Sequence, residues 1–343
     1  MEHTIALLGF GNVLRAFAEL LEQKNPTLEQ RYGYRLKVVG ISTNSHGRAI
    51  DPAGIKLSQA LELVRSGEGL DSLDAGWNIQ STPEFIQAVP AEVILEATWL
   101  DPTSGQPAID FVRTALETGK HVVTANKGPV AFAYQSLRDL ARQKDLGFLF
   151  ESTVMDGMPL HSLAREGLLG LEISRIRGIL NSTTNAILTR LEEGIAFEKA
   201  VAEMQEAGLA EADPSNDVDG WDSAVKIVVL ANVFMGGDLR PSDVHREGIR
   251  DITLQDAKSA LTNGERIKLV CEATQEGGHI HAQVRPLRLP LSDPLANTNY
   301  TVCAVSIDTD VLPQVSLIEG PSSPTTTAYG MLVDTLNVLR GRR

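Results

Sequence analysis

The sequence predicts an α/β fold with two domains: a mostly parallel sheet with crossover helices, then an α+β domain whose sheet is largely antiparallel. The chain has 343 residues, which exceeds one ordinary core and suits two domains. Up to about residue 150, short apolar runs alternate with helical patterns, as in a parallel sheet. Beyond residue 151, several strand candidates alternate apolar and polar residues, which is typical of an antiparallel sheet with one covered face.

The first domain is expected to span residues 1–150. Its first strand candidate, residues 5–8, is a short, continuous apolar run, typical of a strand that is buried on both faces. Helical patterns follow the first strand to about Glu22 and recur at residues 107–118 and 134–143. The expected strands are residues 5–8, 36–41, 93–97, 121–124 and 148–150.

The second domain is expected to span residues 151–324. Helices dominate from Pro159 to Phe234. A final helix within residues 325–343 follows the turn 320–324 and is expected to return to the first domain. The expected strands of the second domain are residues 173–179, 267–273, 280–284, 300–307 and 314–318.

The composition excludes several classes of protein. The formal net charge of −13 would repel a polyanion, so no nucleic acid partner is expected. Only two cysteines occur, too few for a disulfide framework. The N-terminus has no basic region followed by a long apolar run, and no apolar stretch approaches the length of a membrane span. We therefore expect a cytoplasmic protein with a small-molecule substrate and no membrane partner.

A glycine-rich turn follows the first strand. Gly9 permits a tight turn, and Gly11 allows the backbone to approach a pyrophosphate at the start of a helix. This context predicts a Rossmann-type, dinucleotide-binding first domain, with Asn12 and Val13 at the helix start also contacting the cofactor. Leu14 stands where the fingerprint has Gly or Ala, so local repacking is expected.

The end of the second strand predicts the choice of cofactor. An acid there would favour NAD, because it binds the ribose 2′-hydroxyl. The chain instead has Ser42, several polar residues and Arg48, which could meet a 2′-phosphate. The prediction is NADP or NAD, leaning towards NADP; the alternative for Arg48 is a solvated loop residue.

Residues 210–226 contain five carboxylates in a loop that runs into a helix. Asp222 and Lys226 are four residues apart, so they share one helix face. A lysine among acids is a candidate acid/base. A calcium loop is excluded because Lys226 would occupy the position of the bidentate glutamate. The alternative interpretation of residues 210–226 is a solvated acidic turn.

This segment resembles the signature of homoserine dehydrogenases, an NAD(P)-dependent oxidoreductase family. Residues 119–129 also resemble that family, which implies that Lys127 lies near cofactor and substrate. Residues 96–98 end the preceding strand, and the family carries a Thr near the nicotinamide at that place, so the resemblance implies that Thr98 contacts the cofactor. Residues 181–185 resemble a further family segment and suit helix capping as well as ligand contact. The signature positions are Gly208, Asp213, Pro214, Asp217, Gly220, Asp222 and Lys226.

Two family landmarks depart from the usual pattern. Related enzymes bind a sodium ion at a turn that matches residues 151–158, but Met155 and Asp156 replace small residues here. The turn before the last helix, residues 320–327, departs from the Gly-Ala-Gly-like turn that is usual in the family. The resemblance therefore implies a divergent branch, without a C-terminal regulatory domain. The possible ligands of a monovalent cation are Glu151, Val154, Asp156 and Met158.

The resemblance implies reversible conversion of L-homoserine to L-aspartate 4-semialdehyde, in threonine, methionine and isoleucine biosynthesis, by a homodimer. Lys226 would move the proton, tuned by Asp222 and Asp217, and Lys127 would assist. Glu211 and Asp222 would hold the substrate's ammonium group. The alternatives are a dehydrogenase of another small amino-acid alcohol or aldehyde, and a nucleotide-binding regulator without catalysis.

Overall fold

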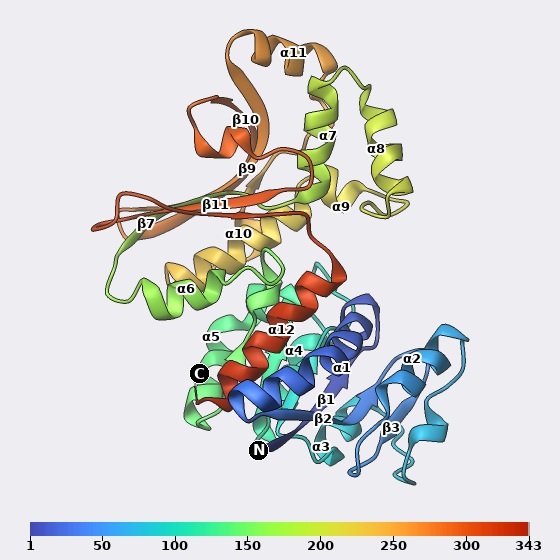
Figure 1. The fold of residues 1–343 in the computed structure, drawn as a ribbon. Helices are drawn as coiled ribbons and strands as arrows, with labels where there is room; N and C mark the ends of the chain where they lie inside the picture. The colour runs from blue at the N-terminus through green and yellow to red at the C-terminus, as the bar shows by residue number, and fades with distance from the viewer. Residues whose placement is uncertain (342–343) are drawn as a thin grey trace. The chain divides into compact units, whose positions relative to one another are not determined.

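The computed structural model describes residues 1–341, which form two compact units (Figure 1). The first unit combines Met1–Pro159 with the C-terminal segment from Ser323, and the second is Leu160–Ser322. Residues 151–159, assigned to the second domain from the sequence, lie with the first unit. Residues 342–343, at the end of the expected helical segment 325–343, lie outside the described residues.

The first unit is built on a six-stranded sheet with the order β3-β2-β1-β4-β5-β6. Every neighbouring pair is parallel except β2 and β3, which are antiparallel. The predicted parallel sheet is therefore confirmed, and β3 is an addition that sequence reasoning missed. The strands are β1 (Glu2–Leu8), β2 (Arg35–Ser42), β3 (Arg48–Ile50), β4 (Val93–Glu96), β5 (His121–Thr124) and β6 (Phe148–Leu149).

Helices pack around this sheet, and the last helix of the chain lies beside the first one (Figure 1). The central strands β1, β4 and β5 each contain a fully buried apolar segment, residues 5–8, 93–95 and 122–123, as strands covered on both faces must. The helices are α1 (Asn12–Tyr32), α2 (Leu57–Arg65), α3 (Thr82–Ala88), α4 (Ala108–Glu117), α5 (Lys127–Gln143) and α12 (Pro324–Leu339), with the short 3₁₀ segments η1 (Asp71–Leu73) and η2 (Glu151–Thr153).

Helices α1 and α5 are longer than the sequence suggested. The helix α1 continues through Pro26 to Tyr32, and the side chain of Asn25 pairs with the backbone N–H and C=O of Leu36 in β2. The helix α5 begins at Lys127, because the side chain of Asn126 caps it by accepting the N–H of Gly128 at 2.9 Å. Lys127 is thus the first helical residue and not part of a loop.

The second unit contains a six-stranded sheet with the order β12-β11-β7-β9-β10-β8. All pairs are antiparallel except β10 and β8, so the predicted, largely antiparallel sheet is confirmed. The strands are β7 (Ile173–Ile179), β8 (His245–Arg246), β9 (Glu265–Glu276), β10 (His279–Pro290), β11 (Cys303–Thr309) and β12 (Val315–Glu319).

The helices of the second unit include α10, which packs against β9 and β10 and is buried over most of its length. The helices are α6 (Leu160–Gly167), α7 (Ser182–Glu192), α8 (Phe197–Glu206), α9 (Ser215–Val218), α10 (Trp221–Phe234) and α11 (Leu254–Thr262), with the 3₁₀ segments η3 (Pro241–Asp243) and η4 (Pro294–Asn297). Among the described residues, no helix combines the length and apolar character that a membrane crossing needs.

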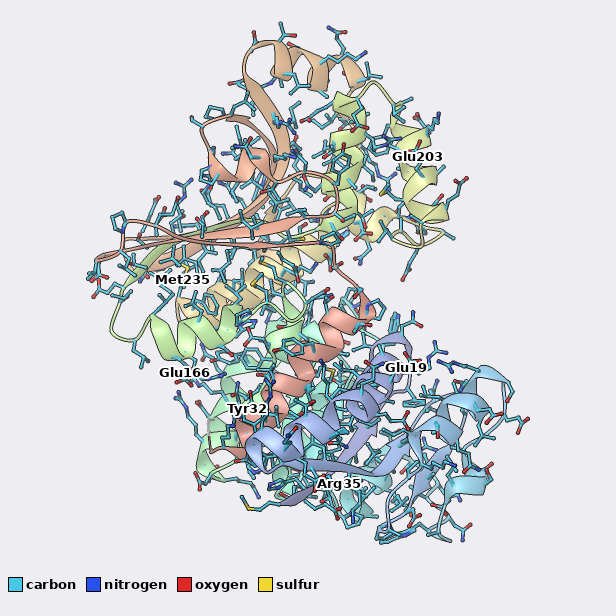
Figure 2. All side chains as sticks on the ribbon, in the orientation of Figure 1. Glu19, Tyr32, Arg35, Glu166, Glu203 and Met235 are labelled. Atoms are coloured by element: carbon cyan, nitrogen blue, oxygen red, sulfur yellow. The ribbon has the colours of Figure 1, made fainter. Side chains whose placement is uncertain are left out.

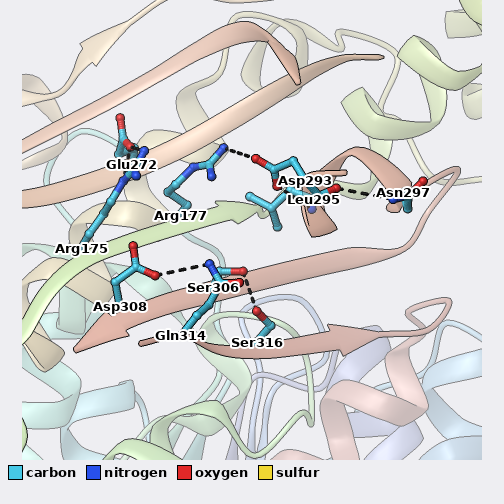
Figure 3. Close-up of polar contacts among 10 residues, drawn as sticks. All are labelled: Arg175, Arg177, Glu272, Asp293, Leu295, Asn297, Ser306, Asp308, Gln314 and Ser316. Atoms are coloured by element: carbon cyan, nitrogen blue, oxygen red, sulfur yellow. Dashed lines mark hydrogen bonds and ion pairs between the residues drawn. The ribbon is translucent and has the colours of Figure 1, made fainter. Parts of the chain in front are cut away.

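Polar contacts follow one face of the second sheet (Figure 3). The guanidinium of Arg175 pairs with Glu272 on β9, and that of Arg177 pairs with Asp293 at 3.0 Å. The hydroxyls of Ser306 and Ser316 lie 2.8 Å apart between β11 and β12. Elsewhere, charged side chains such as Glu19, Arg35 and Glu166 lie at the surface (Figure 2).

Candidate functional site

The glycine-rich turn joins β1 to α1 with a conformation that only glycine suits. Gly9 has a φ of 84°, and a Cβ there would lie 2.6 Å from the carbonyl oxygen of Ala97. Its N–H donates to the carbonyl of Ser42 at 2.8 Å, which ties the turn to the end of β2. A Cβ on Gly11 would meet nothing within 4 Å, so the start of α1 is open to a ligand.

Leu14 takes the place of the third fingerprint glycine without disturbing the turn. Its side chain is fully buried and belongs to the core cluster that includes Ile5, Leu7 and Leu95. Val13, predicted as a cofactor contact, is partly buried and also packs against this core. The helix is therefore held to the sheet by apolar packing, while the N–H groups of its first turn remain available to an anion.

A cavity of about 580 Å³ lies at this turn, over the carboxyl ends of the central strands. Parallel sheets bind ligands at that edge. None of the described residues that line this cavity is an aspartate or a glutamate. Of the predicted cofactor residues, Gly9, Gly11, Ser42 and Thr98 line it. The other lining residues are Leu8, Phe10, Arg15, Thr43, Asn44, Ser45, His46, Val64, Thr82, Ala97, Trp99, Pro107 and Phe111.

The cationic side chain on the cavity wall is Arg15, which the sequence analysis did not single out. Its guanidinium donates to Oδ1 of Asn12 at 2.7 Å, so the first turn of α1 holds it in place. Arg48 does not line the cavity. Its Nη2 is 3.3 Å from the hydroxyl of Thr82, and its Nε is buried without a hydrogen-bond partner.

A buried carboxylate fixes the loop that carries Thr98. Oε1 of Glu96 accepts both the N–H and the hydroxyl of Thr98, at 2.8 Å and 2.6 Å. Its Oε2 accepts the hydroxyl of Thr124 at 2.6 Å. Burial raises the pKa of Glu96, although these hydrogen bonds oppose the rise. The side chain of Asn126 donates to the carbonyl of Thr98 at 3.3 Å, so the ends of β4 and β5 are linked just before Lys127.

The acidic motif of the second unit brings three predicted residues together. Nζ of Lys226 donates to Oδ2 of Asp222 at 2.8 Å and to the carbonyl of Leu180 at 2.7 Å. The side-chain amide of Asn181 donates to Oδ1 of Asp217 at 2.7 Å and to Oδ2 of Asp222 at 2.9 Å. The ammonium group and the two carboxylates thus meet at the junction between β7 and α7.

Burial and charge act in opposite directions on the pKa values of this cluster. Burial alone would lower the pKa of Lys226, but the charge of Asp222 and further interactions with Cys303 and Asp217 outweigh it and raise the pKa above its ordinary value. Burial, followed by the charge of Asp222, raises the pKa of Asp217. Lys226 therefore carries its proton at neutral pH.

Other acids of the motif lie apart from this cluster. The side chain of Asp219 pairs with Arg250, with Nη2 to Oδ2 at 3.1 Å. Glu211 is exposed, and its backbone carbonyl accepts a hydrogen bond from Gln205 at 3.0 Å. The structure thus gives Asp217 and Asp222, and not Glu211, direct contact with the groups around Lys226.

The candidate ion turn is tied to the last helix. Met155 and Asp156 both have positive φ values, 59° and 47°. Oδ2 of Asp156 accepts the N–H of Ser323 at 3.2 Å and the hydroxyl of Thr326 at 2.7 Å, at the start of α12. A Cβ on Gly157 would lie 2.4 Å from the carbonyl of Thr326. The two departures from the family pattern, at residues 155–156 and 320–327, therefore contact each other.

Comparisons with known proteins agree with this geometry. The family model described as "Homoserine dehydrogenase" matches residues 159–336, and "Homoserine dehydrogenase, NAD binding domain" matches residues 9–151. An NAD(+)-dependent homoserine dehydrogenase of Pseudomonas canavaninivorans is 37% identical, over 98% of this chain and 96% of that protein. A homoserine dehydrogenase of Methanocaldococcus jannaschii is also 37% identical, over 97% and 98%. The chain belongs to the homoserine dehydrogenase family.

Solved structures support the same conclusion. A putative homoserine dehydrogenase of Archaeoglobus fulgidus superposes with a TM-score of 0.87 at 32% identity, covering 98% of this chain and 99% of that one. A hyperthermophilic archaeal homoserine dehydrogenase in complex with NADPH gives 0.84 at 30% identity, covering 99% and 98%. The activity is thus NAD(P)-dependent interconversion of L-homoserine and L-aspartate 4-semialdehyde. The predicted family, fold and enzyme class are confirmed, and the two alternative functions are not favoured.

Proposed function

We propose that Lys226 is the group that gives a proton to the substrate oxygen during aldehyde reduction and takes it back during homoserine oxidation. One observation carries this proposal: the ammonium group of Lys226 is partly buried and donates to Asp222 and to the carbonyl of Leu180. A lysine with a raised pKa is a proton donor at neutral pH, which suits reduction.

In homoserine oxidation Lys226 must accept the proton, so a lower pKa of Lys226 is needed. We propose that Asp217 and Asp222 bind the substrate's ammonium group, with Glu211 joining them when substrate is present. Their negative charge would then be shared with the substrate, and the pKa of Lys226 would fall. The reactive residue would thus be tuned by the arrival of the molecule on which it acts.

The cavity of the first unit suits a dinucleotide. The open space at Gly11 fits a pyrophosphate at the start of α1, and Arg15 would pair with a phosphate there, beside Asn12. The loop from Ser42 to His46 offers hydroxyl, amide and imidazole groups to the adenosine ribose. When bound, the nicotinamide ring donates or accepts the hydride.

We propose that this pocket accepts NADP as well as NAD, with NADP favoured. The lining residues that the structure describes include no carboxylate to repel a 2′-phosphate, and Arg15 contributes positive charge. Arg48 would contribute only through the loop that it shares with Ser42. Thr98, held by Glu96, and Lys127, at the start of α5, would contact the nicotinamide and the reacting oxygen.

Three further features belong to this proposal. A monovalent cation would bind the turn of Glu151, Val154, Asp156 and Met158 through main-chain carbonyls, since the carboxylate of Asp156 already holds α12. The assembly would be a homodimer formed through the sheet of the second unit, and the location cytoplasmic. Sedimentation in solution tests the dimer, and activity in sodium, potassium and choline chloride tests the cation.

The experiment that tests the proton-transfer role compares Lys226→Ala with the unchanged enzyme in homoserine oxidation, followed by absorbance of the reduced cofactor. We expect kcat to fall at least ~10²-fold, the lower range for a general acid/base. Arg250→Ala is the matched control, because Arg250 pairs with an acid of the same motif away from Lys226. A Lys226→Ala enzyme with near-normal kcat would refute the role.

A further inference from the structure

A single amide connects two carboxylates of the acidic motif, Asp217 and Asp222. Asn181 is the last residue before α7, and its side chain is 5% exposed. Its Oδ1 accepts the N–H of Thr184 at 2.8 Å, which caps the helix. Its Nδ2 donates to Asp217 and to Asp222, at 2.7 Å and 2.9 Å. Both halves of the amide are therefore engaged, on opposite sides.

The cap fixes which half of the amide faces the acids. The N–H of Thr184 needs an acceptor, so Oδ1 must point towards α7. A flipped amide would place an oxygen against two carboxylates and an NH₂ group against an N–H donor. The helix cap thus orients the donor, in the same way that a supporting hydrogen bond fixes the tautomer of a catalytic histidine.

We propose that Asn181 is a positioning residue for the reaction: its amide holds Asp217 and Asp222 side by side as one paired site for the ammonium group of the substrate. The inference rests on the proposed ammonium site and adds the residue that assembles it. Asn181 does not itself touch the reacting atoms in this account.

Electrostatics explains why such a donor is needed. Asp217 and Asp222 repel each other, and burial adds to the cost of ionising Asp217. Lys226 on α10 interacts with both acids, the buried thiol of Cys271 on β9 interacts with Asp222, and the side chain of Thr183 also hydrogen-bonds Asp217. Lys226 contacts Asp222 directly, so Asn181 is the donor shared by both acids.

Three variants separate positioning from capping. Asn181→Ser keeps an acceptor for the N–H of Thr184, because serine is a favoured cap, but it loses the donor. Asn181→Asp keeps the cap and the size, and places a third carboxylate beside the other two. Thr253→Ala removes a cap from α11 in the same unit, where the side chain of Thr253 bonds Asp256, and is the matched control.

The readout is log(kcat/KM) against pH for aspartate 4-semialdehyde reduction, in which Lys226 acts in its protonated form. The acid limb is the fall of kcat/KM at low pH, where Asp217 and Asp222 take up protons and can no longer bind the ammonium group. Loss of the Asn181 donor makes these carboxylates easier to protonate. In Asn181→Ser the acid limb should therefore move up by about one pH unit, the effect of one hydrogen bond to a charged group. Asn181→Asp should move it further. At neutral pH, KM should rise more than kcat falls. Thr253→Ala should lower Tm and leave the limb in place.

An acid limb that stays in place in both Asn181 variants, with kcat/KM lowered equally at every pH in step with Tm, would overturn the proposal and leave Asn181 as a cap. This outcome is distinct from failure of the proposed function. If Lys226→Ala retained normal kcat, the proton-transfer role would fail. If Lys226→Ala were inactive while Asn181→Ser kept the pH profile of the unchanged enzyme, only the positioning role would fail.

Discussion

Replacing Lys226 by methionine should separate the contribution of this side chain to stability from its contribution to catalysis. The change keeps the apolar stem and removes the ammonium group that lies 2.8 Å from Asp222. Asp222 would remain buried next to Asp217, with Asn181 as its donor. Breaking a buried ion pair by removing one partner costs about 3–5 kcal/mol.

The exposure of the two side chains determines how far the free energy of unfolding is expected to fall. The side chains of Lys226 and Asp222 are 18% and 10% exposed, so water reaches both and screens part of the unpaired charge. We therefore expect the free energy of unfolding to fall by about 3 kcal/mol, at the lower end of that range. In the double variant Lys226→Met with Asp222→Asn, no unpaired charge remains at the pair, and most of this loss should be recovered.

The assay is urea unfolding followed by circular dichroism, run beside kcat for homoserine oxidation on the same preparations. The double variant should regain stability and remain at least ~10²-fold slower, because the proton donor is still absent. Losses of stability that simply add in the double variant would refute a direct interaction between Lys226 and Asp222. Recovery of activity along with stability would refute the role of Lys226 in catalysis.

Three other changes test the site at separate points. Asp217→Asn should raise Tm at pH 8 and lose that advantage as pH falls towards 3.8, because a carboxyl with a raised pKa in the folded state loses its stabilising proton as pH rises; an advantage that is independent of pH would contradict this. Arg15→Gln should raise KM for NADP by about tenfold, the equivalent of one lost charged hydrogen bond, and Arg48→Gln should change it less; the reverse ranking would show that Arg48 carries the contact. Asp156→Ala should lower the free energy of unfolding by about 1 kcal/mol, as loss of a helix cap does, and a chain with unchanged Tm would show that α12 does not depend on this contact.

Most of the fold follows from local patterns in the sequence. The continuous apolar run at residues 5–8 predicts a strand that is buried on both faces, and the structure has β1 there. Helix ends were harder to predict. The first helix was expected to end near Glu22 and a later one to begin at residue 134, but α1 continues to Tyr32, and α5 starts at Lys127 because of the cap at Asn126. These outcomes depend on contacts that a local pattern does not contain.

The contacts of the candidate site also divide into local ones, which the sequence predicts, and long-range ones, which it does not. Asp222 and Lys226 share a helix face, so their spacing alone predicts the contact. The contact of Asn181 with Asp217 joins residues 36 positions apart, and only tertiary structure brings them together. Glu211 shows the limit of motif reasoning, since membership of the motif does not place its side chain beside Lys226.

The helix α12 has a consequence for the order in which the protein matures during synthesis. Buried residues of this helix, including Met331 and Leu332, belong to the same core as β1 and α1, and Asp334 accepts the N–H of Glu151 at 2.7 Å. The hydrophobic core of the first unit therefore stays incomplete until residues 324–339 have left the ribosome. The last strand of the second unit ends at residue 319, so this unit can finish folding first. Until α12 has emerged, the first unit exposes apolar core residues, which chaperones would recognise.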